Sequence, residues 1–415
     1  KQGESLAGKK DHAGAAAAYL RAAREFPKDE RAAKACVNAV VEAKLAGDLG
    51  LAKEGADVAI RDHEGAPEAA QAVAAMSEAL RLAGLLSEAA GYDEAIVAKY
   101  PKDARARDAS YNAVVARTAL GDYDRAVKDA GDYLRLYGSA SADDADEVTF
   151  LLGKAHERAK HFSDAEKLYS GYSSRAKNLD HKIEALVRLA LVRVELKDRA
   201  GADRALESAV KLGHEHQKSL KEGKTHAAHA RYLQGEQIVG QYDAVTLDAS
   251  GNELKKRLDK KKELLKRAAG IFADCAKMGS GEWATAALYR IGYVFEGFAN
   301  ALKTAQPPAG VKAEDAEAFR QIVDPIAEQF LEKAIDAYEN GWKKAVELKI
   351  FNKWTADMRA ALARLSDVAY PPLREQGIET RTVGPAPLPA PIDAPVVAPK
   401  PVATTTTPAA TAGKK

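Results

Sequence analysis

Gly121-Asp122-Tyr123-Asp124-Arg125-Ala126 is the stretch that decides the fold of this chain. Glycine leaves a helix readily in the left-handed conformation, and alanine lets two helices approach closely, so the stretch predicts a turn between two antiparallel helices. The glycine also occurs at Gly84 and Gly47, in two steps of 37 residues. The alanine recurs further, with spacings of 37, 37, 37, 39 and 37 residues, at Ala15, Ala52, Ala89, Ala126, Ala165 and Ala202. A period of this size predicts stacked supersecondary units.

The composition favours helices over strands. Of the 415 residues, 46% are hydrophobic, 29% are charged and only 7% are aromatic, and no long stretch alternates with period two. The net charge of +2 gives no reason to expect nucleic acid as the main partner. No stretch reaches the roughly 18 apolar residues of a membrane helix. The two cysteines, Cys36 and Cys275, lie in different predicted units, which excludes a disulfide framework.

Three consecutive units, at about 107–143, 146–180 and 183–213, show the pattern most clearly. In the middle unit, Leu152-Gly153, Ala165 and Tyr169 stand at the spacing of the Leu-Gly pair, the close-contact alanine and the aromatic of a tetratricopeptide repeat. The chain resembles this repeat family over about residues 1–213. The resemblance implies an all-α fold, a right-handed superhelical α-solenoid of helix-turn-helix repeats, and a function in binding other proteins.

The two ends of the chain depart from the regular repeat. Residues 1–27 are predicted to hold only the second half of a unit, whose unpaired helix offers a surface for self-association. After Gly213 the period loosens, and we predict helices over about 225–239, 252–278, 282–304, 313–348 and 353–367, with a further turn at 241–244. These form a degenerate tetratricopeptide-like module over 214–372. Eight of the sixteen prolines lie beyond Val383, so 373–415 is predicted to be a disordered Pro/Ala/Thr-rich tail.

A second resemblance concerns the region 280–372. Glu332–Glu339, Phe351–Trp354 and Tyr370-Pro371 are similar to the closing module of large envelope-associated tetratricopeptide proteins of deltaproteobacteria, including proteins of gliding motility. This resemblance implies a location in the bacterial periplasm or at the outer membrane, and a cytoplasmic location is the alternative. The chain begins at Lys1 without methionine, so we expect a processed chain or a fragment.

No motif in the sequence indicates catalysis, a cofactor or a metal. There is no His-Glu-x-x-His zinc motif, no phosphate-binding Gly-x-x-x-x-Gly-Lys-Ser/Thr loop and no Gly-x-Ser-x-Gly elbow. Four histidines are close in sequence, but His214 and His216 are expected near a helix end, where imidazoles commonly face water. We therefore predict no metal site at His214, His216, His226 and His229.

The strongest charge feature is the basic run Lys255–Arg267. We interpret it as the solvated face of an amphipathic helix, whose inward face would carry Leu254, Leu258, Leu264 and Leu265. The alternative is a contact with an acidic partner or an anionic surface.

The first helix of each unit is expected to line the inner wall of the superhelix. Aligned on the alanine steps, the inward-facing residues are Tyr111, Val115, Phe150, Lys154, Val187 and Leu191. A mixed aromatic, aliphatic and charged groove suits an extended peptide or an amphipathic helix. The alternative is that Phe150 and Val187 fill the interior. Around Asn112, the positions for a chaperone-type carboxylate clamp lack the required basic residues, since they hold Ala74, Glu78, Glu147 and Leu151.

These observations predict a non-enzymatic scaffold or adaptor that binds a partner peptide or helix in the groove, and the second resemblance implies that it acts within a bacterial envelope-associated assembly. The alternative is that the repeats are the non-catalytic region of a larger enzyme or of a signalling or regulatory protein.

Overall fold

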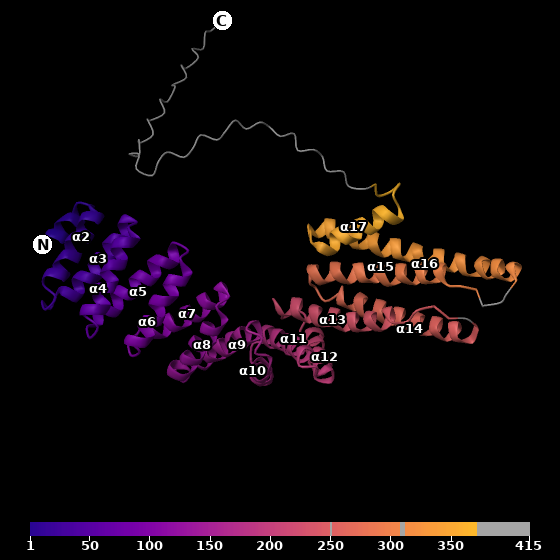
Figure 1. Ribbon diagram of the computed structural model, residues 1–415, viewed down its shortest axis with the longest axis horizontal. Coiled ribbons are helices and arrows are strands. Elements are labelled where there is room, and N and C mark those ends of the chain that lie inside the picture. Colours follow the sequence, from indigo (N-terminus) through magenta and orange to yellow (C-terminus); the bar gives the residue numbers. More distant parts are fainter. Residues whose placement is uncertain (250, 308–311, 372–415) are drawn as a thin grey trace, which may run out of the picture. The chain divides into compact units, whose positions relative to one another are not determined.

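The computed structural model describes residues 1–249, 251–307 and 312–371. The chain divides into a compact unit, Lys1–Tyr370, and a remainder, Pro371–Lys415. The described residues form seventeen helices and no strand, which confirms the all-α prediction (Figure 1). The predicted disordered tail at 373–415 lies outside the described residues.

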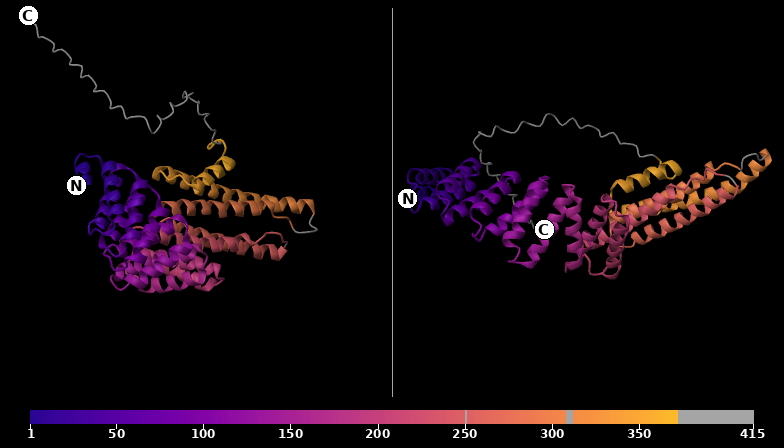
Figure 2. Two further views of the ribbon diagram at one scale, coloured as in Figure 1. Left: turned by 60° about the vertical axis from the view of Figure 1, so that its left-hand side comes forward. Right: turned by 60° about the horizontal axis from the view of Figure 1, so that its bottom comes forward.

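The helices follow one another as antiparallel pairs along the compact unit (Figures 1 and 2). The pairs are α1 (Gln2–Gly8) with α2 (His12–Glu25), α3 (Ala32–Ala46) with α4 (Leu49–Asp62), α5 (Pro67–Leu82) with α6 (Leu86–Lys99), α7 (Ala106–Leu120) with α8 (Tyr123–Tyr137), α9 (Ala142–Arg158) with α10 (Phe162–Arg175), α11 (Leu179–Glu195) with α12 (Arg199–Glu215), α13 (Gly223–Asp243) with α14 (Gly251–Cys275), and α15 (Gly281–Thr304) with α16 (Ala313–Leu348); α17 (Lys353–Leu365) comes last.

We call the odd-numbered helices the A helices and the even-numbered ones the B helices. Each A helix from α1 to α15 packs against its own B helix, and several A helices also contact the next A helix, as in α3 with α5, α11 with α13 and α15 with α17. These neighbour-to-neighbour contacts make the array a solenoid.

The turns between paired helices share one backbone conformation. Gly47, Gly84 and Gly121 have φ angles of 74°, 75° and 76°, as the sequence predicted for residues that leave a helix in the left-handed region. At the same repeat position, three other units carry lysine, with φ of 63° to 65°, at Lys10, Lys160 and Lys197. The turn is therefore retained where the glycine is not.

The close approach of paired helices rests on small residues. All six alanines of the repeat are fully buried, with an exposure of 0%. A Cβ on Gly153 would lie 2.8 Å from the Tyr169 ring, which explains physically why glycine precedes an aromatic in this unit. The tetratricopeptide-like packing predicted from these residues is confirmed.

The N-terminal prediction of a lone second helix is wrong. α1 precedes α2 and packs against it, and Gly3 approaches Tyr19 as closely as Gly153 approaches Tyr169. With only seven residues, α1 is too short to show a helical period in the sequence.

Beyond Gly213, α13 to α16 are longer than the preceding helices, and the predicted bounds of α14 to α17 hold to within a few residues. The predicted turn at 241–244 is wrong because α13 continues to Asp243. Its buried Tyr242 donates a hydrogen bond to the Val294 carbonyl at 3.0 Å, which holds the end of α13 against α15. One hydrophobic core extends from Phe150 to Ala327, so the interior is continuous across residue 213.

Candidate functional site

One position on the A helices, six residues before each left-handed turn residue, recurs along the array. Three repeats place an aliphatic side chain there, and these side chains are exposed by 40% at Val41, 42% at Val115 and 37% at Leu191. The other repeats place a charged side chain there, so that the row reads Glu4, Val41, Glu78, Val115, Lys154 and Leu191. The A-helix face thus alternates charged and aliphatic side chains from unit to unit.

The six residues predicted to line the groove divide between this face and the interior. Val115 and Leu191 are exposed, while Tyr111 and Lys154 are half-buried. Phe150 and Val187 are buried, each with an exposure of 2%, and they therefore fit the alternative interpretation, in which they fill the interior. Each lies four residues, about one helical turn, before a position of the row.

Phe150 shows how this interior is built. Its ring lies 5.1 Å from the ring of Tyr172 and 5.5 Å from that of His181, and both pairs are stacked. The Lys154 ammonium lies 4.4 Å from the centroid of the Phe150 ring, which places a cation over an aromatic face. The Lys154 ammonium therefore packs on the face of the buried Phe150 ring.

A charged cluster extends from Lys154 across α9, α11 and α13. Lys154 Nζ lies 3.1 Å from Glu184 Oε1, and Arg188 Nε donates to the same oxygen at 2.8 Å. Arg188 also donates to Glu157 at 3.0 Å, and His226 Nε2 lies 3.6 Å from Glu184 Oε2. We call Lys154, Glu157, Glu184, Arg188 and His226 the charged cluster.

The ionisation of the charged cluster follows from burial and charge together. Burial acts to raise the pKa of Glu184, but Arg188 and Lys154 hold it below its ordinary value. Burial lowers the pKa of His226 despite the attraction of Glu184. Near neutral pH the glutamate is therefore charged and the imidazole neutral, and the cluster joins neighbouring A helices through satisfied ion pairs.

An aromatic cluster continues this face across α13, α15 and α17. The rings of His229 and Trp283 are parallel within 7° and their centroids are 4.0 Å apart. Tyr232 lies 5.0 Å from Trp283 and 5.8 Å from Trp354, and Tyr289 lies 5.6 Å from Trp354. We call these five residues the aromatic cluster. His226 and His229 are one helical turn apart on α13, so the charged and aromatic clusters adjoin.

His229 takes part in the aromatic cluster as a neutral ring. Burial lowers its pKa to about 4, and the positive charge of Arg188, together with that of His226 where it is protonated, acts in the same direction. A neutral imidazole stacks on tryptophan without carrying an unpaired charge into the interior.

Sequence reasoning missed both clusters, except for Lys154. The register of inward-facing residues came from the 37-residue step, which the longer helices after Gly213 interrupt. Glu184 and Arg188 lay within the regular part, and their i,i+4 spacing on a first helix was the available signal. Trp354 entered the sequence analysis only within the segment 351–354 that is similar to envelope-associated proteins.

The remaining candidate features are structural in this fold. His214 Nε2 lies 3.2 Å from Asp274 and does not join His226 in a ligand group. Within the described ranges, no three His, Cys, Asp or Glu side chains are grouped to hold a metal. In α14, Leu264 and Leu265 are buried as predicted. Lys261, expected on the solvated face, is instead buried.

Lys261 is held in the interior by two backbone carbonyls. Its ammonium donates to the Tyr242 carbonyl at 2.9 Å and to the Val245 carbonyl at 2.8 Å, while burial lowers its pKa.

Among the helices of the described residues, none combines the length and the apolar character needed to cross a membrane.

The comparisons with known proteins concern the arrangement of helices. No family model and no curated protein matches the chain. Among solved structures, a TPR repeats protein from Bacteroides fragilis is 13% identical over 62% of this chain and 98% of its own, with a TM-score of 0.34. A tetratricopeptide repeat protein from Parabacteroides merdae is 15% identical over 67% and 91%, with a TM-score of 0.29. A Rap protein complexed with competence and sporulation factor is 10% identical over 88% and 95%, with a TM-score of 0.32. By its own helix pairs, this chain is an all-α solenoid of tetratricopeptide-like repeats.

Proposed function

We propose that the chain is a non-catalytic scaffold whose A-helix face binds a peptide or helix of a partner protein. The observation that carries this proposal is the row of exposed positions in which Val41, Val115 and Leu191 alternate with charged residues. An extended or helical segment with apolar side chains at matching intervals would bury these aliphatic groups, and a pre-formed face lowers the ordering cost of binding.

The finer features of the proposal rest on sequence resemblance. The similarity of 280–372 to envelope-associated proteins supports a place in a bacterial envelope assembly, in the periplasm or at the outer membrane, with gliding motility as one such setting. The alternative function is that of a non-catalytic repeat region serving a larger enzyme or a regulatory protein.

The test is affinity purification with the exposed aliphatic positions altered. The double variant Val115→Asp/Leu191→Asp should lose the partners that the unaltered chain retains, because binding would then bury a carboxylate where it now buries an aliphatic side chain. Both side chains are exposed, so the melting temperature should stay within a few degrees. Val346→Asp, at a residue of α16 exposed by 47%, is the matched control and should retain every partner. A double variant that keeps all partners would show that the A-helix face is not the binding surface.

A further inference from the structure

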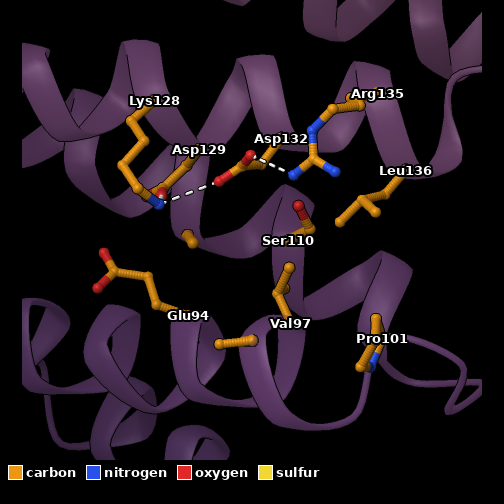
Figure 3. Close-up of a pocket in the computed structure, with 11 residues that line it drawn as sticks. Glu94, Val97, Pro101, Ser110, Lys128, Asp129, Asp132, Arg135 and Leu136 are labelled. Atoms are coloured by element: carbon orange, nitrogen blue, oxygen red, sulfur yellow. Dashed lines mark hydrogen bonds and ion pairs between the residues drawn. The ribbon is translucent and has the colours of Figure 1, made fainter.

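A cavity of about 270 Å³ opens between the B helices α6 and α8, and residues of α7 also line it (Figure 3). Val97, Ala98 and Pro101 line it from the side of α6, and Leu136 from α8, while Ala113 and Ser110 belong to α7. Lys128, Asp129, Asp132 and Arg135 of α8, together with Glu94 of α6, supply the charged part of the lining. The cavity lies among the B helices and is separate from the exposed row of the A helices.

The repeat that lines the cavity differs from the preceding repeat at three of the lining positions. Relative to the turn residue, Ala113 corresponds to Met76 in the preceding repeat and to Leu152 in the following one. Relative to the buried alanine, Asp129 corresponds to Tyr92 and to Leu168. At these two positions a smaller side chain stands where the adjoining repeats have a larger one, and both smaller side chains line the cavity.

The third position is occupied by Ser110, where the preceding repeat has Val73. Ser110 is 2% exposed, and Figure 3 shows its hydroxyl directed into the space between the helices. Within the described part of the chain, its Oγ has no hydrogen-bond partner, unlike Thr149, which donates to the Ala145 carbonyl at the matching position of the next repeat. A hydroxyl that is nearly fully buried and aimed into a cavity is available to a ligand.

Asp129 brings a second unsatisfied group to the same cavity. It is 6% exposed, and no residue of the described structure offers its Oδ2 a hydrogen bond. Its neighbour Glu94 is also an acid, and two ionised carboxylates cannot donate to one another. Burial, followed by the repulsion of Glu94, raises the pKa of Asp129 to about 6.

The cations near the cavity are already engaged or lie at its mouth. Arg117 Nε donates to Glu94 at 2.6 Å. Lys128 Nζ lies 3.0 Å from Asp132 and 3.9 Å from Asp129, but its side chain is 72% exposed, and Arg135 donates to Asp132 at 2.6 Å. The interior of the cavity therefore has acceptors in excess of donors.

We propose that this cavity is a binding site for an alkylammonium group, with Asp129 and Ser110 receiving the ammonium and the aliphatic wall receiving its methylene chain. An ammonium has three donors and no acceptor, which matches a carboxylate oxygen and a hydroxyl that both lack partners. Val97, Pro101 and Leu136 offer apolar surface to the chain that carries it. A lysine side chain of a partner protein and a free aliphatic diamine share this chemistry. The site does not depend on the A-helix face.

The test follows the methyl signals of Val97 and Leu136 by NMR in the methyl-labelled full chain. Cadaverine and N-acetyl-lysine methylamide should shift these signals to saturation, whereas N-acetyl-norleucine methylamide, which has the aliphatic chain without the ammonium, should not. Tighter binding of the lysine amide would identify a protein side chain as the ligand, and tighter binding of cadaverine a free diamine. Shifts caused equally by the norleucine amide, or by none of the three, would overturn the proposal.

Variants separate the proposed contacts from general loosening of the unit. Asp129→Asn should weaken binding at least tenfold and Ser110→Ala about threefold, whereas Asp132→Asn at the mouth should change it less than twofold. Asp129→Leu, which installs the side chain of the following repeat, should abolish binding and raise the melting temperature. This second variant keeps the test decisive if Asp129→Asn is unstable. Native affinity in Asp129→Leu would refute the site.

Binding should also weaken as the pH falls through about 6, because Asp129 then becomes neutral. The charged groups that face it are Glu94 of α6, Arg117 of α7, and Lys128, Asp132 and Arg135 of α8. Affinity that is constant from pH 7.5 to pH 5 would contradict a carboxylate as the ammonium acceptor.

Discussion

His229 stacks on Trp283 as a neutral ring, and this has a consequence for stability. Its pKa is about 4 in the folded chain and near 6.5 when unfolded, so between these values the unfolded chain binds a proton that the folded chain does not. Its contribution is fully present above pH 6.5 and is lost as the pH falls towards 4. At pH 5 the loss should be about 2 kcal/mol in the free energy of unfolding.

The measurement is chemical denaturation of the native chain and of His229→Phe at pH 7.5 and pH 5. Phenylalanine keeps the ring stack but cannot titrate, so the variant should lose less stability on acidification than the native chain. Asp93 and Asp129, whose pKa values burial raises to about 6, act with the opposite sign in both proteins and cancel in the comparison. Equal pH dependence in the two proteins would mean that His229 is not held neutral by the fold.

At the scale of the element, one repeat contains two glycines with opposite roles. Gly84 has φ of 75° in the turn, whereas Gly91 lies inside α6, and a Cβ at either position would meet no atom within 4 Å. Gly84→Ala should therefore lower the free energy of unfolding by roughly 1 kcal/mol through backbone strain alone. Gly91→Ala should raise it by roughly 0.5–1 kcal/mol because alanine favours the helix. Thermal and urea unfolding of the two variants check the signs, and two changes of the same sign would contradict the assigned turn.

The turns and helices also show what could be predicted from the sequence. The buried alanines recur with little variation, so the register of the regular units was visible without a structure. The left-handed turn residue could be predicted only where it is glycine. Lys160 and Lys197 adopt the same conformation, but lysine is not a residue type that indicates a left-handed turn. The end of α13 was misplaced because Tyr242 packs against α15, a tertiary contact that no local pattern contains.

The candidate sites were less predictable than the helices. The exposed Val115 and Leu191 followed from the register, while Phe150 and Val187 were assigned to the same face because a one-turn displacement along a helix is not resolved by spacing alone. The cavity at Asp129 is lined by residues that differ between adjoining repeats, and a search for what repeats share does not reveal it.

At the scale of the whole molecule, the two largest hydrophobic cores differ in side-chain size. The core around Cys36 consists largely of alanine, whereas the core around Cys275 includes Phe272, Tyr232 and Phe298. Since stabilisation follows the apolar area buried, the alanine-rich units should unfold first. Both cysteines are fully buried free thiols, with burial raising their pKa values to about 11 and about 12, so each is inert until its own unit opens.

Thiol labelling in increasing urea tests this difference. In the single-cysteine variants Cys275→Ala and Cys36→Ala, Cys36 should react at a lower urea concentration than Cys275. Labelling of both thiols at one common concentration would show that the array unfolds as a single cooperative unit.

The repeat that holds Ser110, Ala113 and Asp129 differs from its neighbour at three interior positions while keeping the same turn and the same buried alanine. In evolutionary terms, substitutions in one module of such a chain can form a new pocket while the adjoining modules preserve the fold. The reverse exchange, to the Val73, Met76 and Tyr92 of the preceding module, would close the pocket again. Each module can therefore acquire a pocket by substitutions at its own interior positions, and a chain with more modules has more places where this can happen.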